Sequence, residues 1–185
     1  MPLRLFRVFP FAPSARSRRA AGHPLHLPAP QGAGRIDNPD LYRVLYASTS
    51  SEGAIGEAFG NIAEWSSDLF VVPAMPGAAR SLAEYELERE ALLDLDDPRA
   101  LLKRNLRPSR VVTRDRPTTQ AWARQIFQED GWSGVSWWSF WNPDWVSCGV
   151  WSTDELRVIS VTPLDQRLPT VHAAAETLSR PWTGG

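Results

Sequence analysis

The sequence predicts a single mixed α+β domain, because strand-like and helical patterns alternate irregularly along it. Its 185 residues lie within the usual size of one domain and can bury a core. With 43% hydrophobic and 22% charged residues, the composition is that of a globular protein rather than a disordered one. We find neither an internal repeat nor a clear boundary. We therefore expect one domain over residues 1–185.

Two strands are predicted in the N-terminal part of the chain. Residues 3–9 are apolar at alternate positions, as in a short strand. Residues 41–47 form the second strand, and a regular strand there places Tyr42, Val44 and Tyr46 on one face.

A proline-rich loop over residues 10–34 is expected between these strands, because five prolines exclude a regular element. Loops of this length are often functional. Gly32 and Gly34 allow a tight turn that could bring Arg35 close to a ligand.

A helix is predicted to follow, beginning with a capping box at Thr49 and Glu52 and continuing to about Ile62. Glu57 lies off the apolar stripe of this helix, so it is either exposed or turned towards a cavity. The stripe consists of Ala54, Ile55, Ala58, Phe59 and Ile62.

The rest of the chain shows further strand and helix patterns. Strand candidates lie at 68–73, 81–88, 134–139, 145–151 and 156–162. Helices are predicted from Asp97-Pro98 with an apolar side of Leu101, Leu102 and Leu106, at 118–129 with Trp122, Ile126 and Phe127 inward, and at 169–178.

Composition excludes several classes of protein. A net charge of −1 provides no global field to attract nucleic acid or anionic lipid. The single cysteine, Cys148, excludes an internal disulfide, and three histidines without ligand spacing argue against a metal site. No apolar run approaches the roughly 20 residues that span a bilayer, and no secretory signal is evident. We expect a cytoplasmic protein with no direct nucleic-acid or membrane partner.

Nine tryptophans are the most unusual feature of the composition, and most of them lie close together. Such density usually indicates a core, but it could also form a wall on which a flat ring stacks. The clustered tryptophans are Trp132, Trp137, Trp138, Trp141, Trp145 and Trp151.

Four side chains are candidates for chemistry, although taken singly each has an ordinary structural explanation that the sequence favours. Arg35 could grip a phosphate with its planar guanidinium. Tyr46 could stack on a flat base, and Glu57 could stabilise positive charge on a ribose, as carboxylates do in glycosidic cleavage. Nothing near Ser139 marks it as a nucleophile, because no Gly-x-Ser-x-Gly turn is present.

The order of these candidates in the chain changes their interpretation. They lie in four fragments, namely Gly34-Arg35-Ile36-Asp37-Asn38-Pro39, Leu45-Tyr46-Ala47-Ser48, Ala54-Ile55-Gly56-Glu57 and Gly134-Val135-Ser136-Trp137-Trp138-Ser139. In this order and spacing they resemble the RES domain family, whose pattern Arg7 in the first strand also fits. The resemblance covers roughly residues 3–165, which we expect to be the core of the domain. Two departures are Ile36, where many members have an aromatic residue, and the tryptophan-rich segment, which leaves Ser136 as an alternative to Ser139.

The resemblance implies a fold like that of ADP-ribosyltransferases and a cleft that takes NAD+ as substrate, with no further cofactor. It implies an NAD+ glycohydrolase or phosphorylase that acts as the toxin of a toxin–antitoxin pair. The implied partner is an antitoxin of Xre-like helix-turn-helix type, and a homo-oligomer is left open.

The resemblance also implies roles for individual side chains. Arg35, with Arg7, would hold the pyrophosphate, and Tyr46 would border the nicotinamide. Glu57 would stabilise the oxocarbenium-like ribose, and Ser139 would orient a ribose or a phosphate.

Two other functions stay open at this point. One is an ADP-ribosyltransferase that modifies a protein, and the other is a non-enzymatic module that binds a partner through its tryptophan-rich surface.

Overall fold

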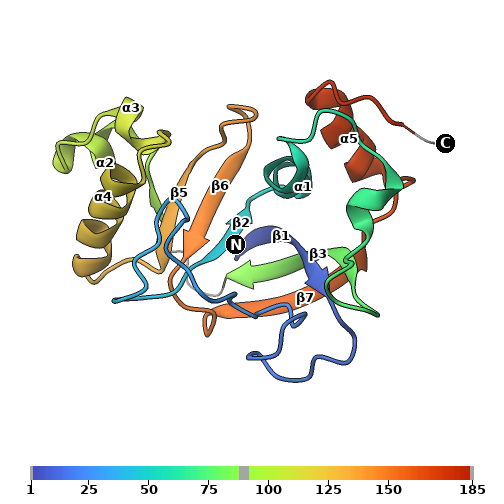
Figure 1. Ribbon diagram of the computed structural model, residues 1–185. Coiled ribbons are helices and arrows are strands. Elements are labelled where there is room, and N and C mark those ends of the chain that lie inside the picture. Colours follow the sequence, from blue (N-terminus) through green and yellow to red (C-terminus); the bar gives the residue numbers. More distant parts are fainter. Residues whose placement is uncertain (1, 88–91, 184–185) are drawn as a thin grey trace.

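The computed structural model describes residues 2–87 and 92–183 and shows a mixed α+β domain built on one seven-stranded sheet (Figure 1). The predicted fold class is confirmed. The strands are β1 (Leu3–Phe11), β2 (Leu45–Ser48), β3 (Ala79–Leu87), β4 (Leu92–Asp94), β5 (Gly134–Trp138), β6 (Val146–Val150) and β7 (Leu156–Pro163). Their order is β4-β5-β6-β2-β1-β3-β7, and all neighbours are antiparallel except β4 and β5.

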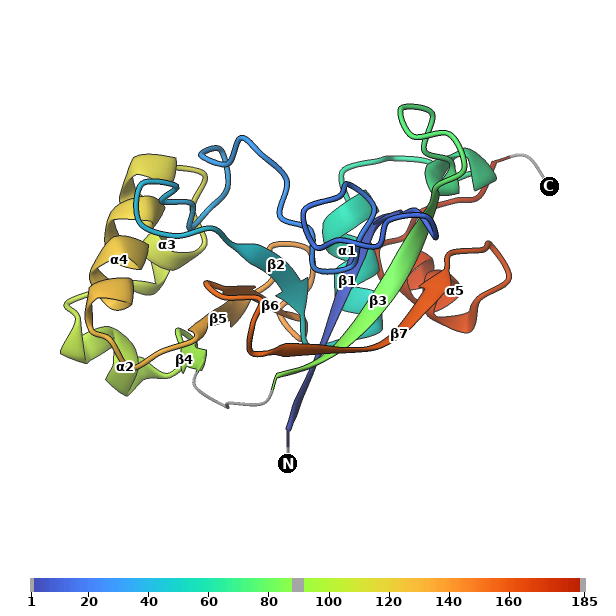
Figure 2. The ribbon, with the colours of Figure 1, turned by 90° about the horizontal axis from the view of Figure 1, so that it is seen from below.

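The helices form two groups at opposite ends of the sheet (Figures 1 and 2). One group, α2, α3 and α4, lies beside β4 and β5, and the other, α1 and α5, lies beside β1 and β3. Their bounds are α1 (Ser51–Phe59), the 3-10 helix η1 (Ser67–Phe70), α2 (Pro98–Lys103), α3 (Pro108–Val111), α4 (Arg116–Gln128) and α5 (Pro169–Thr177). Within the described ranges, no helix has the length and apolar character to cross a bilayer.

The sheet is weakly joined between β1 and β2. These two strands share a single register pair, Phe6 with Ser48, whereas β1 and β3 pair continuously from Leu3–Leu87 to Phe11–Ala79. Because few ladder hydrogen bonds hold β1 to β2, the halves of the sheet can diverge there. This junction is where the candidate site lies.

Three apolar clusters cover the sheet, and the tryptophans contribute to two of them. Trp122 and Trp137 are buried between the α2–α4 group and β4–β6, and Trp65 and Trp145 are buried beneath α1 and α5. Of the clustered tryptophans, Trp137 and Trp145 are buried and confirm the prediction of a core, whereas the other four are only partly buried against the clusters. The third cluster, around Leu5 and Tyr85, lies on the opposite face of β1 and β3.

The proline-rich segment covers that third cluster and is tied to the sheet. Strand β1 extends to Phe11, so the irregular segment is shorter than predicted at its start. Leu25 is buried against the sheet, and the Tyr85 hydroxyl donates to the Pro24 carbonyl at 2.7 Å.

Two strand predictions are wrong in part. The predicted strand 41–47 begins only at Leu45, because the backbone N–H groups of Leu41 and Tyr42 both donate to the Asn38 carbonyl in a turn. The candidate 68–73 is the 3-10 helix η1, capped by the Ser66 hydroxyl, with only Val71 in a bridge to β3. Position 88 of the predicted strand 81–88 lies outside the described residues.

Details of two helix predictions are also wrong. Helix α1 is capped by Ser50 rather than Thr49, since the Ser50 hydroxyl accepts from the Gly53 N–H at 3.0 Å, and it ends at Phe59 rather than Ile62. Ala58 on the predicted stripe is exposed. Leu102 is 79% exposed because α2 is too short to bury more than one side.

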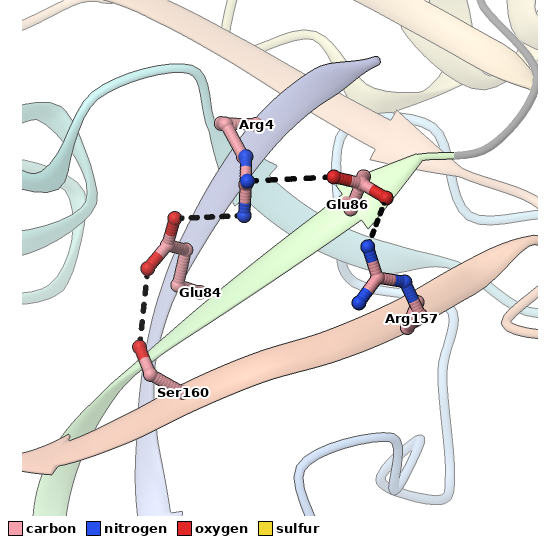
Figure 3. Close-up of polar contacts among 5 residues, drawn as sticks. All are labelled: Arg4, Glu84, Glu86, Arg157 and Ser160. Carbon is pink, nitrogen blue, oxygen red and sulfur yellow. Dashed lines mark hydrogen bonds and ion pairs between the residues drawn. The ribbon is translucent and has the colours of Figure 1, made fainter.

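An ion-pair network joins the three strands at the β7 edge of the sheet (Figure 3). Glu86 on β3 lies between Arg4 of β1 and Arg157 of β7, and its side chain is only 12% exposed. The neighbouring Glu84 accepts hydrogen bonds from Arg4 and from the Ser160 hydroxyl, both at 3.1 Å. Each of these two carboxylates on β3 therefore contacts both neighbouring strands, β1 and β7.

Replacing Glu86 with glutamine is expected to lower the free energy of unfolding by about 1 kcal/mol, because it removes the charge shared by two arginines. Urea denaturation measures this change, which should shrink at about 1 M NaCl as salt screens the pairs. Asp165→Asn, which breaks a more exposed pair with Arg167, is the control and should have a smaller effect. Equal effects of the two variants would contradict the role of the network.

Candidate active site

A pocket of about 290 Å³ opens where the two halves of the sheet meet under α1. This volume is at the lower end of the range for small-molecule sites and suits about half of a dinucleotide. Most of the wall is apolar, with a few polar groups among it. The lining residues are Phe6, Arg7, Val8, Tyr46, Ala47, Ala54, Glu57, Ala58, Trp137, Ser147 and Cys148.

Two serine hydroxyls hold the Glu57 carboxylate at the edge of this pocket. The Ser139 hydroxyl donates to Glu57 Oε1 at 2.6 Å, and the Ser147 hydroxyl donates to the same oxygen at 2.8 Å. The backbone N–H of Trp141 donates to Ser139 Oγ at 3.1 Å and so fixes the position of the Ser139 hydroxyl. Of the described residues, none donates a hydrogen bond to Oε2, so this oxygen is available to a ligand.

Close packing between α1 and the β5–β6 hairpin makes this contact geometrically feasible. At Gly56, an added Cβ would lie 2.2 Å from Trp145 Cζ3, so only glycine allows the helix to approach the indole so closely. The neighbouring Glu57 is thereby brought within reach of the serines on the hairpin. Glu57 is exposed and lines the pocket, as its position off the apolar stripe predicts.

Tyr46 lines the same pocket and ties it to the loop before β2. Its hydroxyl donates to Asp37 Oδ1 at 2.6 Å and accepts from the Ile36 N–H at 3.0 Å. Burial, reinforced by the hydrogen bond to Asp37, raises the pKa of Tyr46 well above its usual value. The phenol therefore stays protonated, with its ring fixed as a wall.

Asp37 is the centre of this loop. Asp37 is only 5% exposed. Its Oδ2 accepts hydrogen bonds from the backbone N–H groups of Gly32 at 2.7 Å and Gly34 at 2.8 Å. A Cβ at Gly34 would lie 2.3 Å from the Tyr46 hydroxyl oxygen, so close packing requires glycine there, whereas Gly32 has open space around it but adopts a positive φ of 145°. The predicted tight turn is present.

Arg35 lies beside the pocket rather than in its lining. Its Nη1 donates to the carbonyls of Val111 at 2.7 Å and Thr113 at 2.9 Å, and its guanidinium lies 5.9 Å from the ring centroid of Trp137. Burial and the charge of Arg116 lower the pKa of Arg35, while Glu57 raises it. The charges of Arg35 and Glu57 therefore interact. The Trp137 indole contacts Arg35 and also lines the pocket.

Arg7 lines the pocket from β1. Its Nη1 donates to the His26 carbonyl of the proline-rich segment at 3.1 Å. The segment therefore orients an arginine at the pocket as well as covering the sheet.

The structure distinguishes between the two candidate serines. Ser139, which follows β5, contacts Glu57, whereas Ser136 is buried within β5 and makes no side-chain hydrogen bond to a described residue. Ser147, which also contacts Glu57, was not predicted from the sequence. The alternation of Ser147 and Gly149 with Cys148 and Val150 does place it on one face of β6, but no motif connects it to Glu57. Among the described residues, no group of three or more His, Cys, Asp or Glu side chains is placed to hold a metal ion.

Three buried titratable groups, of which Cys148 lines the pocket, predict that the protein is destabilised at high pH. Burial raises the pKa values of the Cys148 thiol, Tyr42 and Tyr85 to about 12. The unfolded chain releases these protons near the ordinary values of 9.0 and 10.0, whereas the folded protein keeps them. The stabilisation is therefore complete below pH 9.0 and is lost as the pH rises towards about 12.

The expected slope is up to about 1.4 kcal/mol per pH unit for each group, measured by urea denaturation at several pH values. Tyr85→Phe removes one titrating group and should make the slope shallower. A free energy of unfolding that is constant from pH 9 to pH 11 would contradict this prediction.

Comparisons with known proteins agree with this architecture. The family model of the RES domain matches residues 4–170. A crystal structure of the M. tuberculosis MbcT–MbcA toxin–antitoxin complex contains a chain with the same fold, at a TM-score of 0.61 and 18% identity, covering 97% of this chain and 90% of that chain. No curated protein sequence matches. Because the family match spans most of its length, this chain belongs to the RES domain family.

Proposed function

We propose that this protein cleaves NAD+ and releases nicotinamide. The observation that carries the proposal is the Glu57 carboxylate, held by Ser139 and Ser147 at the edge of a pocket with aromatic walls. Among the described residues, no donor forms a hydrogen bond with Glu57 Oε2, so the negative charge of the carboxylate is available to a bound ligand. The family membership and the fold shared with the MbcT toxin support the same activity.

The chemistry needs little more than positioning and charge. Nicotinamide in NAD+ is a cationic leaving group, so the bond between its nitrogen and the ribose C1′ breaks with the electron pair going to nicotinamide, and no strong acid is required. The positive charge that develops on the ribose is stabilised by the Glu57 carboxylate. Tyr46 and Trp137 enclose the nicotinamide, and Arg35 and Arg7 hold the phosphate side of the substrate.

The ADP-ribosyl cation is then captured at C1′ by a nucleophile. Water yields ADP-ribose with loss of a proton, and inorganic phosphate yields ADP-ribose 1″-phosphate. A protein side chain would be the acceptor in an ADP-ribosyltransferase. The open edge of the pocket beside Glu57 is accessible to a small acceptor.

We further propose that this activity makes the protein the toxin of a toxin–antitoxin pair that acts on cytoplasmic NAD+. The support is the fold shared with MbcT, which crystallised with its antitoxin MbcA. The proposed partner is a protein of Xre-like helix-turn-helix type that closes the pocket. Co-expression with such a protein encoded beside it should relieve growth arrest, and arrest unaffected by every neighbouring protein would refute this part.

The reaction is tested with purified protein and NAD+ labelled in the adenosine half. Proton NMR should show free nicotinamide, and chromatography should place the label in ADP-ribose or, with phosphate present, in its 1″-phosphate. Label retained on protein would instead support a transferase. NAD+ that stays intact, with both acceptors supplied and the protein folded, would refute NAD+ cleavage.

A further inference from the structure

The pocket holds only part of a dinucleotide, so the rest of the substrate must be bound outside it. Its volume of about 290 Å³ suits the nicotinamide and its ribose. The pyrophosphate then lies at the rim, where it needs positively charged donors. The rim next to Trp137 is the side that carries Arg35.

Two further arginines lie close in the chain to the carbonyls that Arg35 contacts: Arg114 on the loop between α3 and α4, and Arg116 at the first position of α4. Arg116 Nη1 donates to the Thr113 carbonyl at 3.3 Å, and Arg35 Nη1 donates to the same oxygen at 2.9 Å. The two guanidiniums therefore approach one another around a single carbonyl. The influence of Arg116 on the pKa of Arg35 agrees with this proximity.

Arg114, on the same loop, extends towards the serine side of the site. Its guanidinium lies 5.5 Å from the ring centroid of Phe140, an exposed side chain that directly follows Ser139. Phe140 belongs to the segment between β5 and β6 that also carries Ser139, so Arg114 lies against this hairpin segment.

These three arginines have no acidic partner within ion-pair distance among the described residues. The adjacent Asp115 carboxylate caps α4 instead, accepting from the Thr118 hydroxyl at 2.6 Å and from the Thr118 N–H at 3.4 Å. Like charges gathered without a counter-ion repel one another, so a bound anion relieves the repulsion. Guanidiniums match phosphate oxygens in geometry.

We infer that Arg35, Arg114 and Arg116 form a phosphate subsite that binds the pyrophosphate of the dinucleotide outside the nicotinamide pocket. The inference rests on the proposed function for the identity of the ligand. It adds Arg114 and Arg116 as binding residues and assigns the α3–α4 loop and the start of α4 to substrate recognition. Inorganic phosphate, the other source of the same chemistry, is distinguished by the experiment.

The test measures equilibrium binding, which needs no turnover. Isothermal titration calorimetry with ADP-ribose, nicotinamide and inorganic phosphate compares the full chain with the Arg114→Gln/Arg116→Gln double variant. ADP-ribose affinity should fall at least about 10-fold in the double variant, while nicotinamide affinity stays within about 2-fold. Arg99→Gln, an exposed arginine on α2, is the matched control and should leave both affinities unchanged.

The outcomes separate this inference from the proposed function. Arginine-dependent ADP-ribose binding without nicotinamide release from NAD+ would support the subsite and refute the activity. Unchanged ADP-ribose affinity in a folded double variant would overturn the subsite, even if NAD+ is cleaved. If the double variant lost only inorganic phosphate binding and kept its ADP-ribose affinity, the subsite would also be overturned. The arginines would then bind the phosphate that acts as acceptor, not the pyrophosphate of the dinucleotide.

Discussion

Replacing Glu57 with glutamine is expected to reduce nicotinamide release about 100- to 1,000-fold while the protein stays folded. The amide keeps the shape of the side chain, and its oxygen can still accept from Ser139 and Ser147. What it removes is the negative charge that opposes the developing positive charge on the ribose. Initial rates of nicotinamide release from NAD+, followed by chromatography, measure the loss.

The matched control for this variant is Glu64→Gln, an exposed glutamate that follows the same helix and lies outside the pocket lining. It should retain full activity. Thermal unfolding of both variants checks that the fold is intact. A folded Glu57→Gln protein with the rate of the parent would remove Glu57 from the catalytic assignment.

The serines are expected to have smaller effects, since each supplies one hydrogen bond to a carboxylate. Loss of such a bond is worth about 1.5 kcal/mol or more, or roughly 10-fold in rate. Ser139→Ala and Ser147→Ala should therefore each reduce kcat about 10-fold, with less change in KM. Ser136→Ala, which truncates a serine away from the carboxylate, should leave both parameters unchanged.

Replacing Asp37 with asparagine is expected to lower the free energy of unfolding by about 2–4 kcal/mol, the largest loss of stability that we predict. The buried carboxylate accepts from two backbone N–H groups and from the Tyr46 hydroxyl. An amide group presents N–H to one of these donors, which leaves it unsatisfied and opens the loop before Arg35. Urea denaturation measures the change in stability.

Nicotinamide release by Asp37→Asn should also fall under conditions where the variant is folded, because Tyr46 and Arg35 lose their common support. The control is Asp40→Asn, which removes an exposed ion pair with Arg124 from the same loop. Exposed pairs contribute about 1 kcal/mol or less. If the two variants unfold at the same urea concentration, Asp37 does not organise the loop.

Local patterns were sufficient for the elements whose own residues decide their structure. The alternation in 3–9 predicted β1, and the apolar spacing of Trp122 and Ile126 predicted α4, because each element buries the face that its sequence marks. Predicted element boundaries were wrong where a neighbouring group forms the hydrogen bonds that the predicted element needed. The Asn38 carbonyl captures the N–H groups that would have started β2 at Leu41, and Ser50 rather than Thr49 reaches the helix N–H groups.

The candidate site shows the same division. Arg35, Tyr46, Glu57 and Ser139 could be selected from the sequence only through their order, which resembles the RES domain family, since each alone has an ordinary explanation. Nothing local indicated Ser147, Arg114 or Arg116. A serine within a strand and two arginines at the start of a helix are common, and only the fold brings Ser147 to Glu57 and Arg116 to the carbonyl that Arg35 also contacts.

The sequence by itself therefore determined the α+β class and the family, because periodicity and ordered motifs are properties of the chain alone. Only the tertiary structure decided that Ser139 rather than Ser136 contacts Glu57, and that Arg35 lies next to the Trp137 indole without lining the pocket. The physical reason is distance along the chain. The Glu57 contacts join residues 82 and 90 positions apart, and no local pattern encodes which strand and helix approach one another.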